Sequence, residues 1–133
     1  MAFTEMEFET EKENWNYYQL ADGSKLKIKI IIANILEDRL NKDKTEYSIN
    51  WSNVLGVIPH KRMKNKKQKP IDDLNFEVIN ETSNEYSLSD GTKISVKPNL
   101  SQISRTDKLD QMGKPIYVIQ SLPSVKIKKT IKV

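Results

Sequence analysis

The chain has 133 residues, the usual size of one domain, and its 37% hydrophobic and 30% charged residues are typical of a globular protein rather than a disordered one. It has no cysteine, which excludes disulfide bonds and cysteine-ligated metals, and we expect a cytoplasmic, intracellular protein. The start lacks the pattern of a signal peptide and the longest apolar stretch, residues 28–36, is too short to span a bilayer, so we expect no membrane contact.

The N-terminal segment is acidic and alternates in character. Met6 and Phe8 flank a polar residue, which predicts a strand with one buried face. The only basic residue in this stretch is Lys12, set against five acids: Glu5, Glu7, Glu9, Glu11 and Glu13. The net charge of +4 is therefore unevenly distributed along the chain.

Residues 16–29 carry the signature of a β-hairpin, because Asp22-Gly23 stands between alternating apolar residues. A two-residue loop would put apolar residues opposite polar ones, whereas a three-residue loop with a left-handed glycine does not. We therefore predict three opposed pairs: Leu20 with Ser24, Tyr18 with Leu26, and Asn16 with Ile28. Aspartate before glycine suits the turn itself, so we assign Asp22 no catalytic role.

Residues 25–36 are apolar on both faces around Ile30-Ile31-Ile32, which predicts a central strand covered on both sides. A polar connection is expected at residues 38–45, followed by a strand at 47–51. Residues 60–73 then read as a basic linker. Six positive charges fall there without an acid between them: Lys61, Arg62, Lys64, Lys66, Lys67 and Lys69.

The second half of the chain resembles the first. With an offset of 68 positions, residues 76–103 match residues 8–35 at eleven of 28 positions, including the Tyr-x-Leu-x-Asp-Gly-x-Lys pattern. A hairpin around Ser89-Asp90-Gly91, a polar connection at 106–114 and strands at 116–119 and 125–127 are expected. Pro98 replaces Ile30 of the first copy and must bend or interrupt its strand, because proline cannot donate to a ladder.

These patterns predict an all-β protein in which an antiparallel β-meander unit is duplicated in tandem. We expect a single domain, residues 1–133, with repeat one at 6–59, the basic linker at 60–73 and repeat two at 74–133. Six to eight strands would close into a small pseudo-twofold barrel or a sandwich, because isolated meanders leave exposed edges.

A second polar feature follows from the hairpin register. Opposite the apolar face of residues 16–29 lie two rings interleaved with lysines: Trp15, Tyr17, Lys25, Lys27 and Lys29. Such a face would let bases stack while phosphates are neutralised, although lysine stems also pack on aromatic rings in ordinary sheets. At the matching positions the second copy has no ring: Ser83, Glu85, Lys93, Ser95 and Lys97.

The function hypotheses follow from this asymmetry. The first is a non-catalytic module that binds nucleic acid or another polyanion through residues 61–69 and the aromatic–lysine face. The alternative is a structural or adaptor protein that docks on another protein through a β edge or an aromatic patch, with residues 61–69 as a solvated, mobile linker. No catalytic, cofactor or metal motif is present, so we expect none of these, and the sequence leaves the oligomeric state open.

Overall fold

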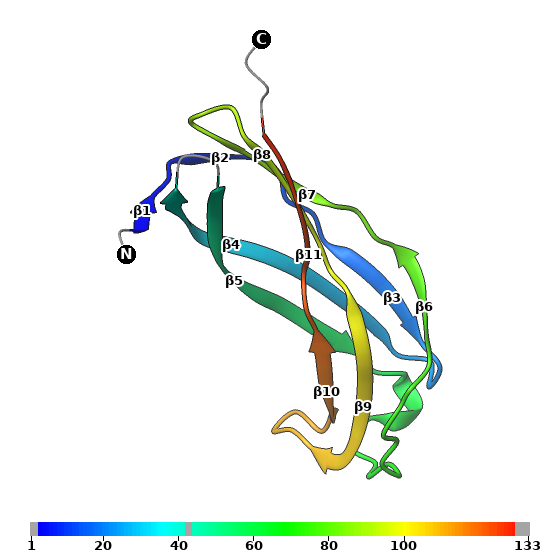
Figure 1. The fold of residues 1–133 in the computed structure, drawn as a ribbon. Coiled ribbons are helices and arrows are strands. Elements are labelled where there is room, and N and C mark those ends of the chain that lie inside the picture. Colours follow the sequence, from blue (N-terminus) through cyan, green and yellow to red (C-terminus); the bar gives the residue numbers. More distant parts are fainter. Residues whose placement is uncertain (1–2, 42–43, 130–133) are drawn as a thin grey trace.

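A computed structural model describes residues 3–41 and 44–129 and is all-β, with antiparallel pairing between its strands. Its one helical element in that range is a 3-10 turn, η1 (Lys61–Met63). The described strands, drawn in Figure 1, are β1 (Phe3–Glu5), β2 (Phe8–Lys12), β3 (Asn16–Leu20), β4 (Lys25–Asn41), β5 (Lys44–Ile58), β6 (Phe76–Asn80), β7 (Asn84–Leu88), β8 (Lys93–Lys97), β9 (Leu100–Leu109), β10 (Pro115–Ser121) and β11 (Ser124–Lys128).

The two Asp-Gly hairpins have the predicted register. In the first, β3 pairs with β4 so that Tyr18 lies opposite Leu26. In the second, β7 pairs with β8 and Tyr86 lies opposite Ile94. Gly23 and Gly91 both have φ of 90°, which glycine adopts without strain. Each aspartate accepts a hydrogen bond at 2.9 Å from the backbone N–H two residues later, so its turn role is confirmed.

The strand before each hairpin, β2 or β6, pairs with the hairpin of the other half. The residues of the hairpins alone do not predict this pairing. β2 pairs with β7, with Phe8 opposite Leu88, and β6 pairs with β3, with Phe76 opposite Leu20. Two buried asparagines stabilise these pairings between the two halves. The Asn84 side chain accepts a hydrogen bond from the Asn14 N–H at 3.0 Å, and the Asn16 side chain accepts one from the Thr82 N–H at 2.7 Å.

The polar connection expected at residues 38–45 is wrong, because β4 and β5 continue through most of it as one long ribbon, in which β4 is central in its sheet and β5 lies at an edge. Their polar residues remain in register, Asp38 opposite Glu46, and β1 adds to β4 at residues 36–38. Side-chain polarity does not end a strand whose backbone groups are paired with a neighbouring strand. Residues 42 and 43 lie outside the described range.

In the second half, the strands that correspond in sequence to β4 and β5 are each interrupted. Pro98 separates β8 from β9, as predicted, and Pro123 separates β10 from β11. The connection expected at 106–114 shortens to a turn at 110–114, because β9 extends to Leu109. These breaks, together with β1, give eleven strands in the described residues rather than the six to eight expected.

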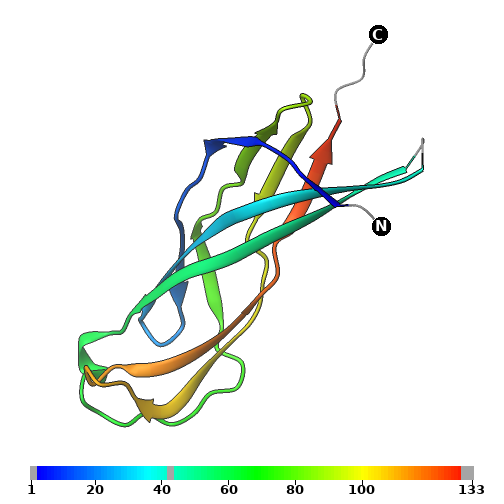
Figure 2. The ribbon, with the colours of Figure 1, turned by 90° about the vertical axis from the view of Figure 1, so that its left-hand side faces the viewer.

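The described strands form three open sheets, and no closed barrel is found among them. One core cluster joins Ile30, Ile32 and Ile35 of β4 to buried residues of β7 and β8. A second joins β3 and β4 to Leu74 and Ile103. Figures 1 and 2 show β4 and β5 running along the molecule, with β9, β10 and the segment after β5 at one end. Both clusters draw on both halves of the chain.

Candidate polyanion-binding surface

The aromatic–lysine face forms on β3 and β4 as the register predicts. Tyr17 lies opposite Lys27, and the Lys27 ammonium nitrogen stands 4.5 Å from the centre of the Trp15 ring. The Lys29 nitrogen stands 5.8 Å from the same ring. Both distances are within the range of cation–π attraction. Trp15 is half-buried, so its ring serves to hold the two lysines in place rather than to offer a free surface to a ligand.

Tyr17 is the exposed ring of this face, with 43% of its surface accessible. Of the three lysines, Lys29 has a counter-charge, since its nitrogen lies 3.9 Å from the Glu13 carboxylate. Within the described residues, Lys25 and Lys27 make no ion pair. The face therefore presents two uncompensated cations beside one accessible aromatic ring.

The basic segment, residues 61–69, starts beside this face. β5 ends at Ile58, opposite Lys25, and the chain then passes over the first hairpin turn. The His60 N–H donates to the Ser24 hydroxyl at 3.4 Å, and its ring lies against Gly23, where an added Cβ would stand 3.0 Å from it. The His60 ring nitrogen Nδ1 accepts the Arg62 N–H at 3.2 Å and caps η1. The basic segment thus begins close to Lys25, at one end of the lysine face.

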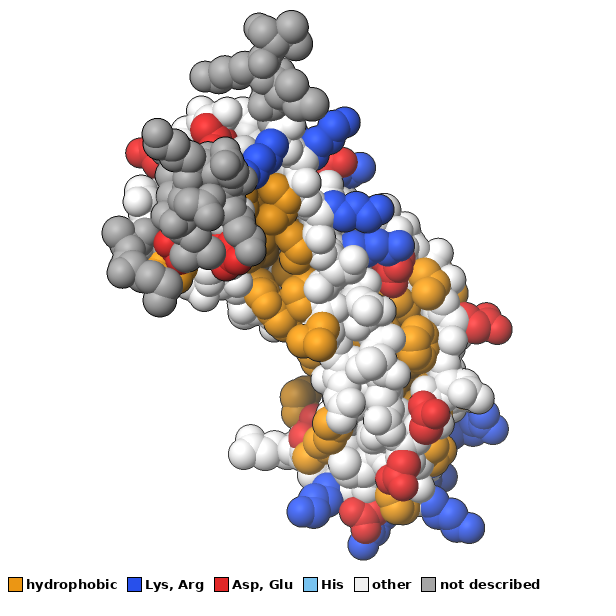
Figure 3. Space-filling model, viewed as in Figure 1, with side chains coloured by type: hydrophobic (Ala, Val, Ile, Leu, Met, Phe, Trp, Pro, Cys, Tyr) orange, Lys and Arg blue, Asp and Glu red, His pale blue; other side chains and the backbone are white. Residues whose placement is uncertain are grey.

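The basic segment is attached to the fold at several points. Met63 is buried, and Asn65, at φ 60°, donates its N–H to the Gly113 carbonyl at 2.8 Å. Lys67 lies 3.9 Å from the Asp107 carboxylate. Figure 3 shows that at this lower end of the molecule acidic side chains stand among the lysines and arginines. These contacts do not fit a loosely attached linker.

The strongest attachment is through Arg105 of β9. Its guanidinium donates to the Lys69 carbonyl from Nε at 3.2 Å and from Nη2 at 2.9 Å. Its Nη1 lies 3.7 Å from the Met63 sulfur and donates to the Asp22 carboxylate at 3.3 Å. The Arg105 and Asp22 side chains are only 9% and 5% exposed. One buried ion pair therefore links the basic segment to the first hairpin turn.

Asp22 collects several donors. Burial by itself raises the pKa of this carboxyl, but hydrogen bonds from the Tyr117 hydroxyl at 2.6 Å, from Ser24 and from Arg105 outweigh burial and lower it. The Ser24 and Tyr117 hydroxyls are 2.9 Å apart and complete the cluster. Asp22 is thus held as a carboxylate that links the first hairpin turn to β9 and β10.

Sequence reasoning missed this cluster. The signal was present, because Arg105 has the same parity as Ile103 on an alternating strand and so had to face inward. A charged residue at such a position requires a buried partner. What the sequence could not supply was the identity of that partner, since Asp22 lies 83 residues away.

The buried Tyr18 and Tyr86 and the half-buried Tyr117 donate to carboxylates: Tyr18 to Glu81 at 2.6 Å, Tyr86 to Glu13 at 2.9 Å and Tyr117 to Asp22 at 2.6 Å. Burial and then these bonds raise the pKa of all three hydroxyls, that of Tyr117 to about 12.

A tyrosine whose pKa is higher in the folded state than in the unfolded state stabilises the fold. This contribution is complete below the unfolded pKa, about 10 for tyrosine, and is lost as pH rises through the folded pKa. We therefore expect the free energy of unfolding to fall steeply above about pH 10, measured by denaturant titration alongside tyrosinate absorbance. Tyr117→Phe should make that fall shallower, and an unchanged slope in this variant would contradict the assignment.

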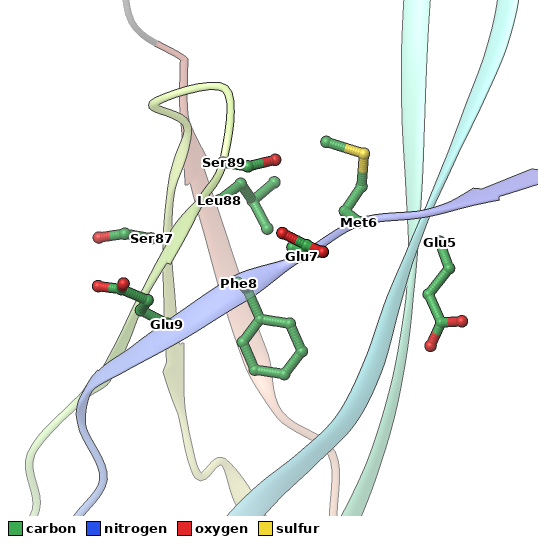
Figure 4. Close-up of a pocket in the computed structure, with 8 residues that line it drawn as sticks. All are labelled: Glu5, Met6, Glu7, Phe8, Glu9, Ser87, Leu88 and Ser89. Atoms are coloured by element: carbon green, nitrogen blue, oxygen red, sulfur yellow. The ribbon is translucent and has the colours of Figure 1, made fainter.

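A groove of about 850 Å³ lies elsewhere, where the chain crosses from β1 to β2 (Figure 4). Its apolar lining comes from Met6, Phe8 and Leu88, and the remaining lining residues are Glu5, Glu7, Glu9, Ser87 and Ser89. Among the described residues, no lysine or arginine lines it, so it belongs to the acidic part of the molecule. Its acidic lining would repel a polyanion.

Comparisons with protein-family models, with curated proteins and with solved structures find no match for this chain. The described part of the chain has no helix with the length and apolar character that a membrane span requires. Any assignment of function therefore rests on the geometry of the lysine face and the basic segment.

Proposed function

We propose that this protein is a non-catalytic module that binds nucleic acid or another polyanion. The observation that carries the proposal is that two basic features lie close together. Lys25, Lys27 and Lys29 follow one face of β4, and β4 lies beside the point where β5 leads into residues 61–69. Alternate residues on a strand are about 7 Å apart, so the three ammonium groups can meet successive charges of an extended anion.

The anchoring of residues 61–69 supports the same function. A segment held by Met63, by Asn65 and through the Lys69 carbonyl loses less freedom on binding than a free linker would. Tyr17 offers a ring on which a base can stack, and Trp15 keeps Lys27 and Lys29 in position. Binding of this kind depends on salt and tolerates many base sequences.

The test is fluorescence anisotropy with single-stranded DNA, duplex DNA and heparin across a salt series. We expect Lys25→Ser/Lys29→Ser to weaken single-strand binding about tenfold and to reduce the salt slope by about 0.7 for each phosphate that is no longer neutralised. Replacing the six basic residues of 61–69 with Ser or Gln should weaken it further. Tyr17→Ala should cost about 1–3 kcal/mol of binding, and Tyr17→Phe much less.

The chain contains a matched control. Lys93→Ser/Lys97→Ser removes the same charge from the corresponding positions of the other hairpin, where Lys97 pairs with Glu81 as Lys29 pairs with Glu13. This control should bind almost as tightly as the unmodified protein. Absence of binding at low salt, or equal losses in the two double variants, would disprove the proposal.

The alternative function is an adaptor that docks on another protein. It is supported by β5, whose second edge pairs with no described strand, and by the exposed Val54, Leu55 and Ile58 near its end. An adaptor would bind no oligonucleotide at low salt, and Leu55→Ser would weaken its complex with a protein partner. The lysine variants would leave that complex unchanged.

We also propose that the fold is a tandem duplication within one domain, two layers packed as a sandwich. Contacts recur at the offset of 68 positions: Tyr18 with Glu81 and Tyr86 with Glu13, and two edge-to-face ring pairs, Tyr18–Phe76 and Phe8–Tyr86, both at 5.9 Å. On this view residues 6–59 and 74–133 are copies that exchanged their first strands, and 60–73 join them. The copies differ in the Trp15/Tyr17 face and in the two proline breaks.

A further inference from the structure

The four-stranded sheet has two edges of equal length. Its strand order is β11-β8-β7-β2, so β11 and β2 are the outer strands, with five residues each. In the described part of the chain, β2 pairs with β7 alone and β11 with β8 alone. Each outer strand therefore has a row of backbone groups available to another strand.

The two edges carry opposite charge. On β2, the exposed Glu9 and Glu11 outnumber the exposed Lys12, and on β11, Lys126 and Lys128 are exposed. On the same face, Glu85 of β7 lies opposite Lys12 of β2, and Lys93 of β8 lies opposite Ser87 of β7. Figure 3 shows lysine and arginine side chains gathered at the upper end, where β11 lies. One edge of the sheet is thus acidic and the other basic.

The faces of the two edges also correspond. On β11, Val125 and Ile127 lie opposite the buried Val96 and Ile94, while Lys126 lies opposite Ser95. On β2, Phe8 lies opposite the buried Leu88, and Glu9 lies opposite Ser87. Figure 4 shows Phe8 on one side of β2, with Glu9 and Ser87 directed to the other side. Both edges therefore put charge outside and apolar residues inside.

Strand direction fits as well. Three successive antiparallel pairings, β11 with β8, β8 with β7 and β7 with β2, make β2 antiparallel to β11. A second copy placed beside the first in the same orientation would thus present its β11 antiparallel to the first copy's β2. Glutamates would then face lysines, and Val125 and Ile127, still 39% and 43% exposed, would be covered.

We propose that this protein associates with further copies of itself through β2 of one copy and β11 of the next. Pairing of like edges, β2 with β2 or β11 with β11, opposes equal charges and is disfavoured. Because the contact joins two different surfaces, each copy keeps one free edge, and the assembly grows as a chain or closes as a ring. This proposal is independent of polyanion binding.

The first test is sedimentation velocity over a concentration series at low and high salt. We expect association at low salt that weakens as salt screens the edge charges. Glu9→Lys/Glu11→Lys gives a copy with two basic edges, and Lys126→Glu/Lys128→Glu gives one with two acidic edges. Each variant alone should associate at least about tenfold more weakly than the unmodified protein.

The two variants together provide the decisive measurement. A mixture of the copy with two basic edges and the copy with two acidic edges should associate again, and so should the fourfold variant in which both edges are reversed. Misfolding of either variant cannot produce this rescue. Circular dichroism of each variant alone confirms that the fold is intact.

A backbone test is independent of charge. The Ser89 N–H donates to the Glu7 carbonyl at 3.0 Å, so by alternation Glu9 also bonds to β7 while the Thr10 N–H points away from it. Thr10→Pro should therefore preserve the monomer and abolish association. A protein that stays monomeric at low salt, a mixture that fails to associate, or unchanged association in Thr10→Pro would overturn the proposal.

Discussion

Arg105→Ala is expected to lower the free energy of unfolding by about 3–5 kcal/mol, the usual cost of removing one member of a buried ion pair. The guanidinium contacts the Asp22 carboxylate, the Lys69 carbonyl and the Met63 sulfur. Its removal leaves the buried Asp22 carboxylate without its cation and the Lys69 carbonyl without its donors. Denaturant titration followed by tryptophan fluorescence measures the change.

Two controls separate this effect from a general loss of charge. Arg105→Lys keeps the charge but cannot reproduce the two bonds to Lys69, so it should be intermediate in stability. Arg62→Ala removes an exposed guanidinium close by and should change stability by less than about 0.5 kcal/mol. In Arg105→Ala, amide exchange should rise more within residues 63–69 than in β7 and β8. A destabilisation below about 1 kcal/mol would show that the ion pair contributes little.

Separating the halves of the chain should abolish folding of each. Fragments 1–72 and 73–133 divide both core clusters, since Ile30 packs with Tyr86 and Leu20 with Ile103. Each fragment also loses the strand that completes its hairpin, because β6 pairs with β3 and β2 with β7. A hairpin with half of its core exposed is marginal in water. Circular dichroism and amide proton dispersion should report two unfolded chains.

Mixing the fragments in equal amounts should restore the β-sheet spectrum and a cooperative unfolding transition. Asn14→Ala is the control, because its backbone N–H still reaches the Asn84 side chain and reassembly should persist. Asn84→Ala removes the acceptor for Asn14 and the donor to the Ile30 carbonyl at 2.8 Å, so reassembly should weaken. A fragment that folds alone would contradict the view that each hairpin needs β2 or β6 from the other half of the chain.

Local features of this fold could be predicted from the sequence because each is encoded within a few residues. The parity of apolar residues around Asp22-Gly23 determined the loop length, and the pairing of Tyr18 with Leu26 confirms it. The break at Pro98 followed from the missing N–H of proline. The aromatic–lysine face followed from the same parity, and Tyr17 opposite Lys27 confirms its register.

The features that could not be predicted depend on distant parts of the chain. Polar residues at 38–45 indicated a loop, yet pairing between β4 and β5 keeps the described ones in strands, and Asp38 also pairs with β1. The pairing of β2 with β7 and of β6 with β3 cannot be predicted from the local sequence, because either hairpin offers a compatible edge. The anchoring of 61–69 depends on Arg105, which no pattern within the segment reveals.

The pairing of β2 with β7 has a consequence for synthesis of the chain. Phe8 lies opposite Leu88, so β2 has to wait until some eighty more residues have left the ribosome. Chains that depend on such distant contacts fold slowly, because the entropy of closing a long loop is lost before the contacts compensate for it. During that wait Glu7, Glu9 and Glu11 keep the unpaired strand charged, which protects it from aggregation. The acidic residues around β2 therefore protect the folding of the strand that carries them.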